Sequence, residues 1–151
     1  MTSIELSAEQ SFGSAARMVI AARSAEVFAH PLERVLDPQR PEGVHKMRVA
    51  TRRLRAALEI FSAAFPSKRF GKALAGVKEL ADALGERRDC DVQIELLESL
   101  RADARRSERK AIDDLLDELR AEQVIANEHL LAALEHARSK RLEERLEGLT
   151  T

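Results

Sequence analysis

The chain has 151 residues, of which 44% are apolar, and a formal net charge of −1, so it can bury a core and is not a disordered polyelectrolyte. We expect a single domain over residues 1–151. The one cysteine, Cys90, excludes an intramolecular disulfide and fits a reducing compartment. No apolar run approaches the roughly 20 residues that cross a bilayer. These features predict a soluble, cytoplasmic protein without a membrane partner.

The near-neutral net charge hides an uneven distribution. Residues 40–72 contain nine basic and two acidic residues, whereas the rest of the chain contains sixteen basic and twenty-four acidic ones. Such asymmetry favours a local anion-binding site on an otherwise acidic body over general adhesion to nucleic acid or membrane.

The composition favours helices, because Ala, Leu, Glu and Arg dominate and Trp and Tyr are absent. A first helix is predicted to start after Ser7, which stands three residues before Gln10 as in a capping box, and to end near His30. A second is predicted over residues 42–65, stopped by Pro66. The chain is therefore predicted to be all-α.

The second half of the chain predicts long helices. One segment over residues 67–84 meets Gly85, which either ends it or interrupts a longer helix. The next covers about residues 86–105, and a last helix from Ser107 could approach 40 residues, or about 60 Å. A helix of that length would rest on a partner subunit, unless it is kinked or frayed at its end. We expect an antiparallel helical bundle with a long C-terminal helix.

The second predicted helix carries an apolar stripe beside a basic band. Apolar residues recur at spacings of three and four and form one core-facing stripe at about 100° per residue: Val44, Met47, Thr51, Leu54, Leu58, Phe61 and Phe65. On the same scale, one flank of this stripe is a continuous band that consists of Arg55, Arg48, Arg52 and His45. Lys46 and Arg53 fall on the opposite flank.

Stacked arginines repel one another, so this band needs negative charge nearby. Within the helix only Glu59, four residues after Arg55, is suitably placed. Either acids of neighbouring helices pair with the band, or it stays solvated, or it is a track for a polyanion. Arginine binds phosphate oxygens through a planar fork and never titrates. His45 would gain a second N–H donor on protonation, so binding would strengthen as pH falls.

Two segments carry a resemblance to a known family. The stretch VHKMRVATRRLRAAL at residues 44–58 and the stretch LGERRDCDV at residues 84–92 resemble the two signatures of the CHAD domain, the conserved histidine α-helical domain. The resemblance is strongest over about residues 7–100 and implies an all-helical module that binds inorganic polyphosphate in a basic groove. By position it points to His45, Arg48, Arg52, Arg53, Arg55 and Arg88, with Lys46, Asp89 and Asp91 as secondary residues.

The second signature leaves two interpretations of Arg88. On sequence alone, Arg88, Asp91 and Glu95 share a helix face and form a surface ion-pair ladder. The resemblance instead suggests that Asp91 or Asp89 holds the Arg88 guanidinium toward the groove. Of the other candidates, His30 is predicted at a helix end, Cys90 as a buried thiol, and His129 and His136 stand too far apart on one helix to share a metal ion.

The favoured function is therefore non-catalytic polyphosphate binding, with no cofactor and no metal. The chain has no ExExK stretch of the triphosphate-cleaving CYTH domain that is sometimes fused to this family, so we expect no enzyme activity. Nucleic acid is an unlikely partner, because the charged face has no Asn, Gln or aromatic residue to contact bases. The alternatives are a nonspecific binder of nucleic-acid backbone and a protein-interaction scaffold that has lost polyphosphate binding.

The resemblance also bears on assembly and location. CHAD proteins commonly contain two related helical halves, and only the first is recognisable here. We expect a homodimer in which each chain supplies one basic helix, with the last helix as a contact. As with some relatives, polyphosphate granules are a candidate location within the cytoplasm.

Overall fold

A computed structural model describes residues 4–151; residues 1–3, which begin the predicted domain, lie outside the described residues. The described chain contains helices and no strands, which confirms the all-α prediction. In chain order the elements are α1 (Phe12–Phe28), α2 (Leu32–Val35), α3 (Pro41–Ile60), the 3₁₀ turn η1 (Ser62–Ala64), α4 (Ser67–Asp103), α5 (Arg106–Ser139) and α6 (Leu142–Thr150).

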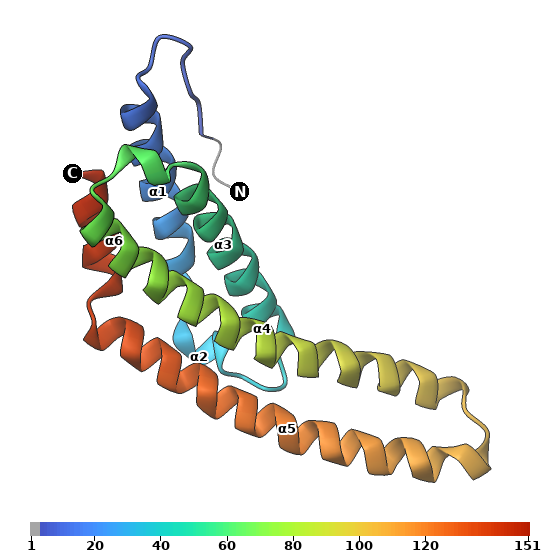
Figure 1. The fold of residues 1–151 in the computed structure, drawn as a ribbon. Helices are drawn as coiled ribbons and strands as arrows, with labels where there is room; N and C mark the ends of the chain where they lie inside the picture. The colour runs from blue at the N-terminus through green and yellow to red at the C-terminus, as the bar shows by residue number, and fades with distance from the viewer. Residues whose placement is uncertain (1–3) are drawn as a thin grey trace.

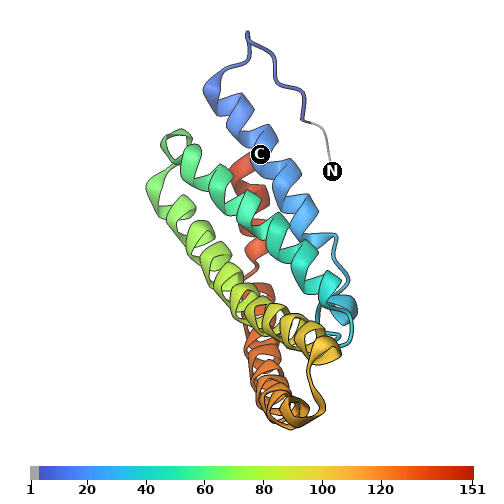
Figure 2. The ribbon, with the colours of Figure 1, turned by 90° about the vertical axis from the view of Figure 1, so that its right-hand side faces the viewer.

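The helices form a bundle with a projecting arm. α1, α3, α6 and the first half of α4 pack together, while α5 runs antiparallel to α4 (Figure 1). The arm is a two-helix hairpin that extends beyond the bundle and consists of the second half of α4 and the first half of α5. The same hairpin is seen after a 90° turn (Figure 2).

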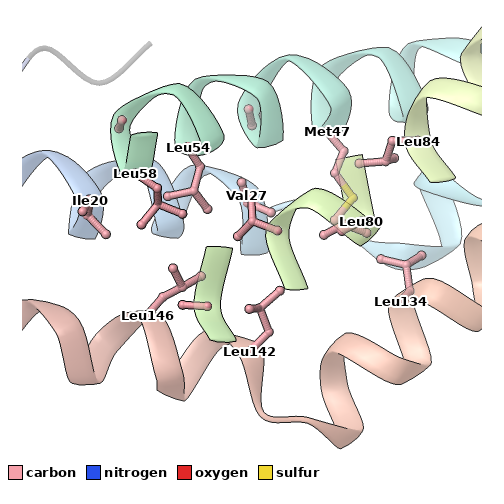
Figure 3. Packing of buried hydrophobic residues seen from close by; sticks show 14 of the residues in the cluster. Ile20, Val27, Met47, Leu54, Leu58, Leu80, Leu84, Leu134, Leu142 and Leu146 are labelled. Atoms are coloured by element: carbon pink, nitrogen blue, oxygen red, sulfur yellow. The ribbon is translucent and has the colours of Figure 1, made fainter. Parts of the chain in front are cut away.

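The core lies where α1, α3, α4 and α6 meet. Ile20, Met47, Leu84 and Leu146 are among its fully buried side chains (Figure 3). The predicted apolar stripe of α3 is confirmed, because its members from Val44 to Leu58 are buried; Phe61 and Phe65 are half-buried. Each buried aliphatic side chain of this kind stabilises the fold by about 1.5–3 kcal/mol. This burial fixes which side of α3 faces solvent.

The predicted start of the first helix was wrong. The N-cap is Ser11, whose Oγ accepts a hydrogen bond from the Ser14 N–H at 3.2 Å. Ser7 instead accepts the Gln10 N–H at its carbonyl, in a turn, and its hydroxyl donates to the Glu9 carboxylate. The Ser7 hydroxyl also accepts the Glu9 N–H, so it bonds within this turn while Ser11 caps the helix.

The long helices also differ from their prediction. α4 continues through Gly85 to Asp103, because buried neighbours such as Leu84 and Arg87 hold it against a glycine cost of about 1 kcal/mol. The last helix does not approach 40 residues. α5 ends at Ser139, Arg141 adopts a left-handed conformation with φ 54°, and α6 turns back onto α1. The kinked alternative is therefore the correct one.

Candidate functional site

The basic face of α3 lacks acidic partners. Among the six basic residues of this face, only Arg55 forms an ion pair with another described residue, with its Nε 3.0 Å from Glu59 Oε1. The other five make no ion pair or side-chain hydrogen bond within the described chain: His45, Lys46, Arg48, Arg52 and Arg53. Arg48 is half-buried and the other four are exposed. Within residues 4–151, no acid of a neighbouring helix therefore forms an ion pair with these five side chains.

One flank of α3 borders a hollow against α1. His45, Lys46 and Arg53 line this hollow of about 500 Å³ together with Glu26 and His30 of the α1 side. The helical wheel put His45 on one flank of α3 and Lys46 and Arg53 on the other, but in the structure all three line this hollow. Burial, and next the charge of Lys46, lower the pKa of His30. His30 follows the end of α1, as predicted.

A second hollow continues the first past the start of α3. It has a volume of about 510 Å³ and is lined by His30, Arg34, Arg40, Glu42 and Lys46, among others. Sequence reasoning missed Arg34 and Arg40. Arg34 stands outside both signatures, and Arg40 was counted only as part of the basic segment. A sequence signal for them does exist. Pro31 and Pro41 mark the starts of two helices only ten residues apart, so the residues between them must stay close to the basic helix.

The other flank of α3 faces α4. Here Glu59 bridges two bases, because Lys78 Nζ of α4 lies 3.9 Å from the same Glu59 Oε1 that binds Arg55. Arg48 stands seven residues before Arg55 and so lies on the same flank. The predicted pairing of Arg55 with Glu59 is confirmed. The bases of α3 thus face both neighbouring helices, with Arg52 on the outward crest.

Of the two interpretations of Arg88, the surface ion pair with Glu95 is confirmed, whereas the partner suggested by the resemblance, Asp91 or Asp89, was wrong. The Arg88 guanidinium binds Glu95, with Nη1 3.0 Å from Oε1 and Nη2 3.4 Å from Oε2, and it contacts neither Asp91 nor Asp89. Arg88 and Glu95 are two helical turns apart on one face of α4, whereas Asp91 is turned into the protein. Asp89 is exposed and forms no ion pair in the described chain.

Asp91 belongs instead to a buried polar network that sequence reasoning missed. Arg87 Nη1 donates to Asp91 Oδ1, which also accepts from Gln123 Nε2 of α5 at 2.7 Å. Arg87 Nε donates to Asn127 Oδ1 at 3.2 Å, and Asn127 Nδ2 donates to the Leu36 carbonyl at 3.0 Å. Arg87 and Asp91 are only 0% and 2% exposed. The network ties the α2–α3 connection to α4 and α5.

Cys90, His129 and His136 each occupy a position with a structural rather than a ligand-binding role. Cys90 is buried, as predicted, and its burial raises the pKa of the thiol. His129 Nδ1 lies 3.0 Å from Glu86 Oε1, and His136 Nδ1 lies 2.7 Å from Glu79 Oε1, so each histidine joins α5 to α4. Residues 4–151 contain no group of three or more His, Cys, Asp or Glu that could hold a metal ion.

Over residues 4–151, these observations define an all-α protein whose helix α3 has five basic side chains without ion-pair partners. A family model described as the CHAD domain matches residues 18–151. The chain therefore belongs to the CHAD domain family, as its two signatures predicted. The match continues through α5 and α6. No curated protein and no solved structure gave a match. No helix in residues 4–151 is long and apolar enough to cross a membrane.

Proposed function

We propose that this protein binds inorganic polyphosphate without catalysing its cleavage, and that the basic face of α3 is the binding site. The observation that carries the proposal is that the five basic residues between His45 and Arg53 form no ion pair with any residue that the structure describes. From the first to the last of them the helix rises about 12 Å. Such a row suits a chain of phosphates better than one small anion. Membership of the CHAD family supports the same ligand class.

The side chains have distinct proposed roles. Arg48, Arg52 and Arg53 offer forks that bind phosphate oxygens bidentately, while Lys46 contributes a mobile point charge. His45 contributes a ring N–H donor at the start of the row. Because these groups form no ion pair within residues 4–151, phosphate need not displace a described carboxylate to reach them.

Two further residues are bound to carboxylates in the free protein. Arg55 is held by Glu59, and Arg88 by Glu95. In the proposed complex they act at the α4 side of the site, with Glu95 orienting the Arg88 fork. Substitution Arg88→Lys tests this role: a held fork loses affinity on becoming a point charge, whereas a simple surface charge does not.

The proposed site gains a second basic helix in a homodimer. The outward side of α5 supports such a contact, because Val124, Ile125 and Leu131 are 57%, 51% and 42% exposed. Light scattering of the wild type and of a Val124→Glu/Leu131→Glu variant measures this directly. A wild-type monomer at concentrations that bind polyphosphate overturns the dimer while leaving the binding site in place.

The decisive experiment is calorimetric titration with long-chain polyphosphate at two salt concentrations. We expect binding by the wild type that weakens with salt, and a loss of about a hundredfold or more in Arg48→Ala/Arg52→Ala, because each removed fork makes charge-assisted hydrogen bonds. The matched control is Arg106→Ala/Lys110→Ala, which removes two charges at the far end of the arm and should bind normally. If the α3 variant binds as tightly as this control, the site is refuted.

Competition separates polyphosphate from nucleic acid. A polyphosphate site prefers the long polyphosphate over DNA of equal total charge, whereas a binder of phosphate backbones treats the two alike. If the wild type binds neither polymer, the family signature marks a scaffold that has lost this activity.

A further inference from the structure

A second group of basic side chains gathers where α4, α5 and α6 meet. Arg69 and Lys72 of α4 and Arg145 of α6 line a hollow of about 300 Å³ together with Gly148. Lys72 and Arg145 also line an adjoining hollow of about 360 Å³, to which Lys140 contributes at the end of α5. Four cations from three elements therefore share one continuous depression.

These cations have no counter-charges in the structure. None of the four forms an ion pair or a side-chain hydrogen bond within residues 4–151, and none donates to a carbonyl at the end of α6. The acid that lines the depression, Glu79, is bound to His136 at 2.7 Å. Like charges that line one depression repel one another, so binding of an anion there would stabilise the arrangement.

The start of α4 adds positive potential to the same place. Its first turn, residues 67–70, contains Lys68 and Arg69 and no acid, and its N-cap Pro66 gives no side-chain hydrogen bond. A helix N-terminus carries a partial positive charge that normally favours acidic residues. Bases at this position are unfavourable by themselves and become favourable beside an anion.

This depression lies on the far side of α4 from the basic face of α3. Lys78 marks the α3 side, because its amine approaches Glu59 of α3 at 3.9 Å. Arg69 stands nine residues earlier, which places it about 180° around the helix. The proposed α3 site and the depression are therefore separate surfaces that a single short ligand does not span.

We propose that the depression between α4 and α6 is a second anion site that takes a short run of inorganic phosphates, such as a triphosphate-length segment. The role of this second site rests on the proposed function in one respect. If α3 holds one segment of a polyphosphate, the second site holds another segment of the same or a neighbouring polyphosphate chain. One protein molecule then links two stretches of polyanion. The ligand class follows from four cations in a shallow, solvent-open depression.

A tryptophan reporter tests the second site by itself, because the chain contains neither Trp nor Tyr. Gly148→Trp places the reporter in the depression, where a side chain meets open space and no positive φ opposes it. Ala56→Trp places a matched reporter on the exposed surface of α3. Each reporter protein is titrated with inorganic tripolyphosphate, and far-UV circular dichroism confirms that its helices are retained.

We expect saturable emission changes from both reporters. Adding Lys72→Gln/Arg145→Gln to the Gly148→Trp protein should lower its affinity for tripolyphosphate at least about tenfold, since two charge-assisted contacts are lost. Adding Arg106→Gln/Lys110→Gln, which removes the same charge at the end of the arm, should not. A second pair, Arg69→Gln/Lys72→Gln, repeats the test without altering α6.

The two reporters separate the two proposals. A response from Ala56→Trp but not from Gly148→Trp overturns the second site and leaves the α3 site standing. The reverse result supports the second site and refutes binding at α3. An equal loss in the charge-matched control shows general electrostatic attraction and overturns the second site, as does a Gly148→Trp response that neither glutamine pair weakens.

Discussion

Removing the Asp91 carboxylate should destabilise the protein strongly. Arg87 is 0% exposed, and Asp91 Oδ1 accepts hydrogen bonds from both Arg87 Nη1 and Gln123 Nε2. The substitution Asp91→Ala leaves a buried guanidinium without its counter-charge and an amide without its acceptor. Breaking a buried pair in this way costs about 3–5 kcal/mol, out of a total unfolding free energy of about 5–15 kcal/mol.

Replacing both charges should cost less than replacing one. In the native pair, Arg87 Nη2 and Asp91 Oδ2 have no hydrogen-bond partner, so the charges are buried without full compensation. The double variant Arg87→Met/Asp91→Leu removes these groups together and fills the space with apolar atoms. We expect it to recover at least about 2 kcal/mol of the loss. It does not regain everything, because Asn127 and Gln123 lose partners.

The assay is urea unfolding followed by far-UV circular dichroism, because a chain without Trp or Tyr gives no useful fluorescence signal. Asp89→Ala is the matched control: this acid lies two residues away, is exposed and makes no ion pair in the described chain, so its loss should change stability by less than about 0.5 kcal/mol. If Asp91→Ala is no more destabilising than Asp89→Ala, or if the double variant is less stable than Asp91→Ala, the reasoning fails.

Three other measurements check the fold. Gly85→Ala should raise the unfolding free energy by about 1 kcal/mol, because its Cβ meets open space in a helix. Gly43→Ala should lower it, since its Cβ would clash with the Arg34 carbonyl oxygen; thermal melts that order the two variants oppositely contradict this. Cys90 should resist thiol reagents at pH 7 until urea exposes it, because burial raises the pKa of the thiol; equal rates with and without urea would refute that burial. The pKa of His30 is lowered on folding, so its contribution to stability is present above the ordinary imidazole pKa of about 6.5 and is lost as pH falls. The unfolding free energy of the wild type relative to that of His30→Gln should therefore decrease from pH 7 to pH 5. A difference that stays constant contradicts the lowered pKa.

The sequence predicts the parts of the fold that depend on local periodicity. The apolar stripe of α3 repeats every three or four residues, so its buried side could be assigned before any neighbour was known. The end of this helix was predicted wrongly, because α3 stops at Ile60 and Pro66 is instead the N-cap of α4. Choices between nearly equal local options were not predictable. Ser7 and Ser11 are both competent caps, and Gly85 is compatible with either a break or a continuous helix, so tertiary packing decides each case.

In the candidate site, too, features that follow from local periodicity were predicted, and features that depend on neighbouring helices were not. The solvent-facing side of α3 was predicted, since it lies opposite the apolar stripe, but whether acids of neighbouring helices pair with its bases was left open. The surroundings of Arg87 were not predicted and those of Arg88 were left open, because adjacent residues on a helix point about 100° apart and only the position of α5 makes one of them core and the other surface. Likewise, Arg69 and Arg145 are 76 positions apart in the chain, and no local pattern relates them.

The buried network gives a physical reason why a costly ion pair lies beside a basic surface. Asn127 passes the hydrogen-bond chain from Arg87 to the Leu36 carbonyl, and Leu36 belongs to the connection that leads into α3. That connection carries Arg40, and Arg34 just precedes it; both line the hollow that they share with Lys46. An apolar core could stabilise α4 against α5 equally well, but it could not hold a backbone carbonyl of this connection in one direction. The network therefore fixes the position at which the basic helix begins.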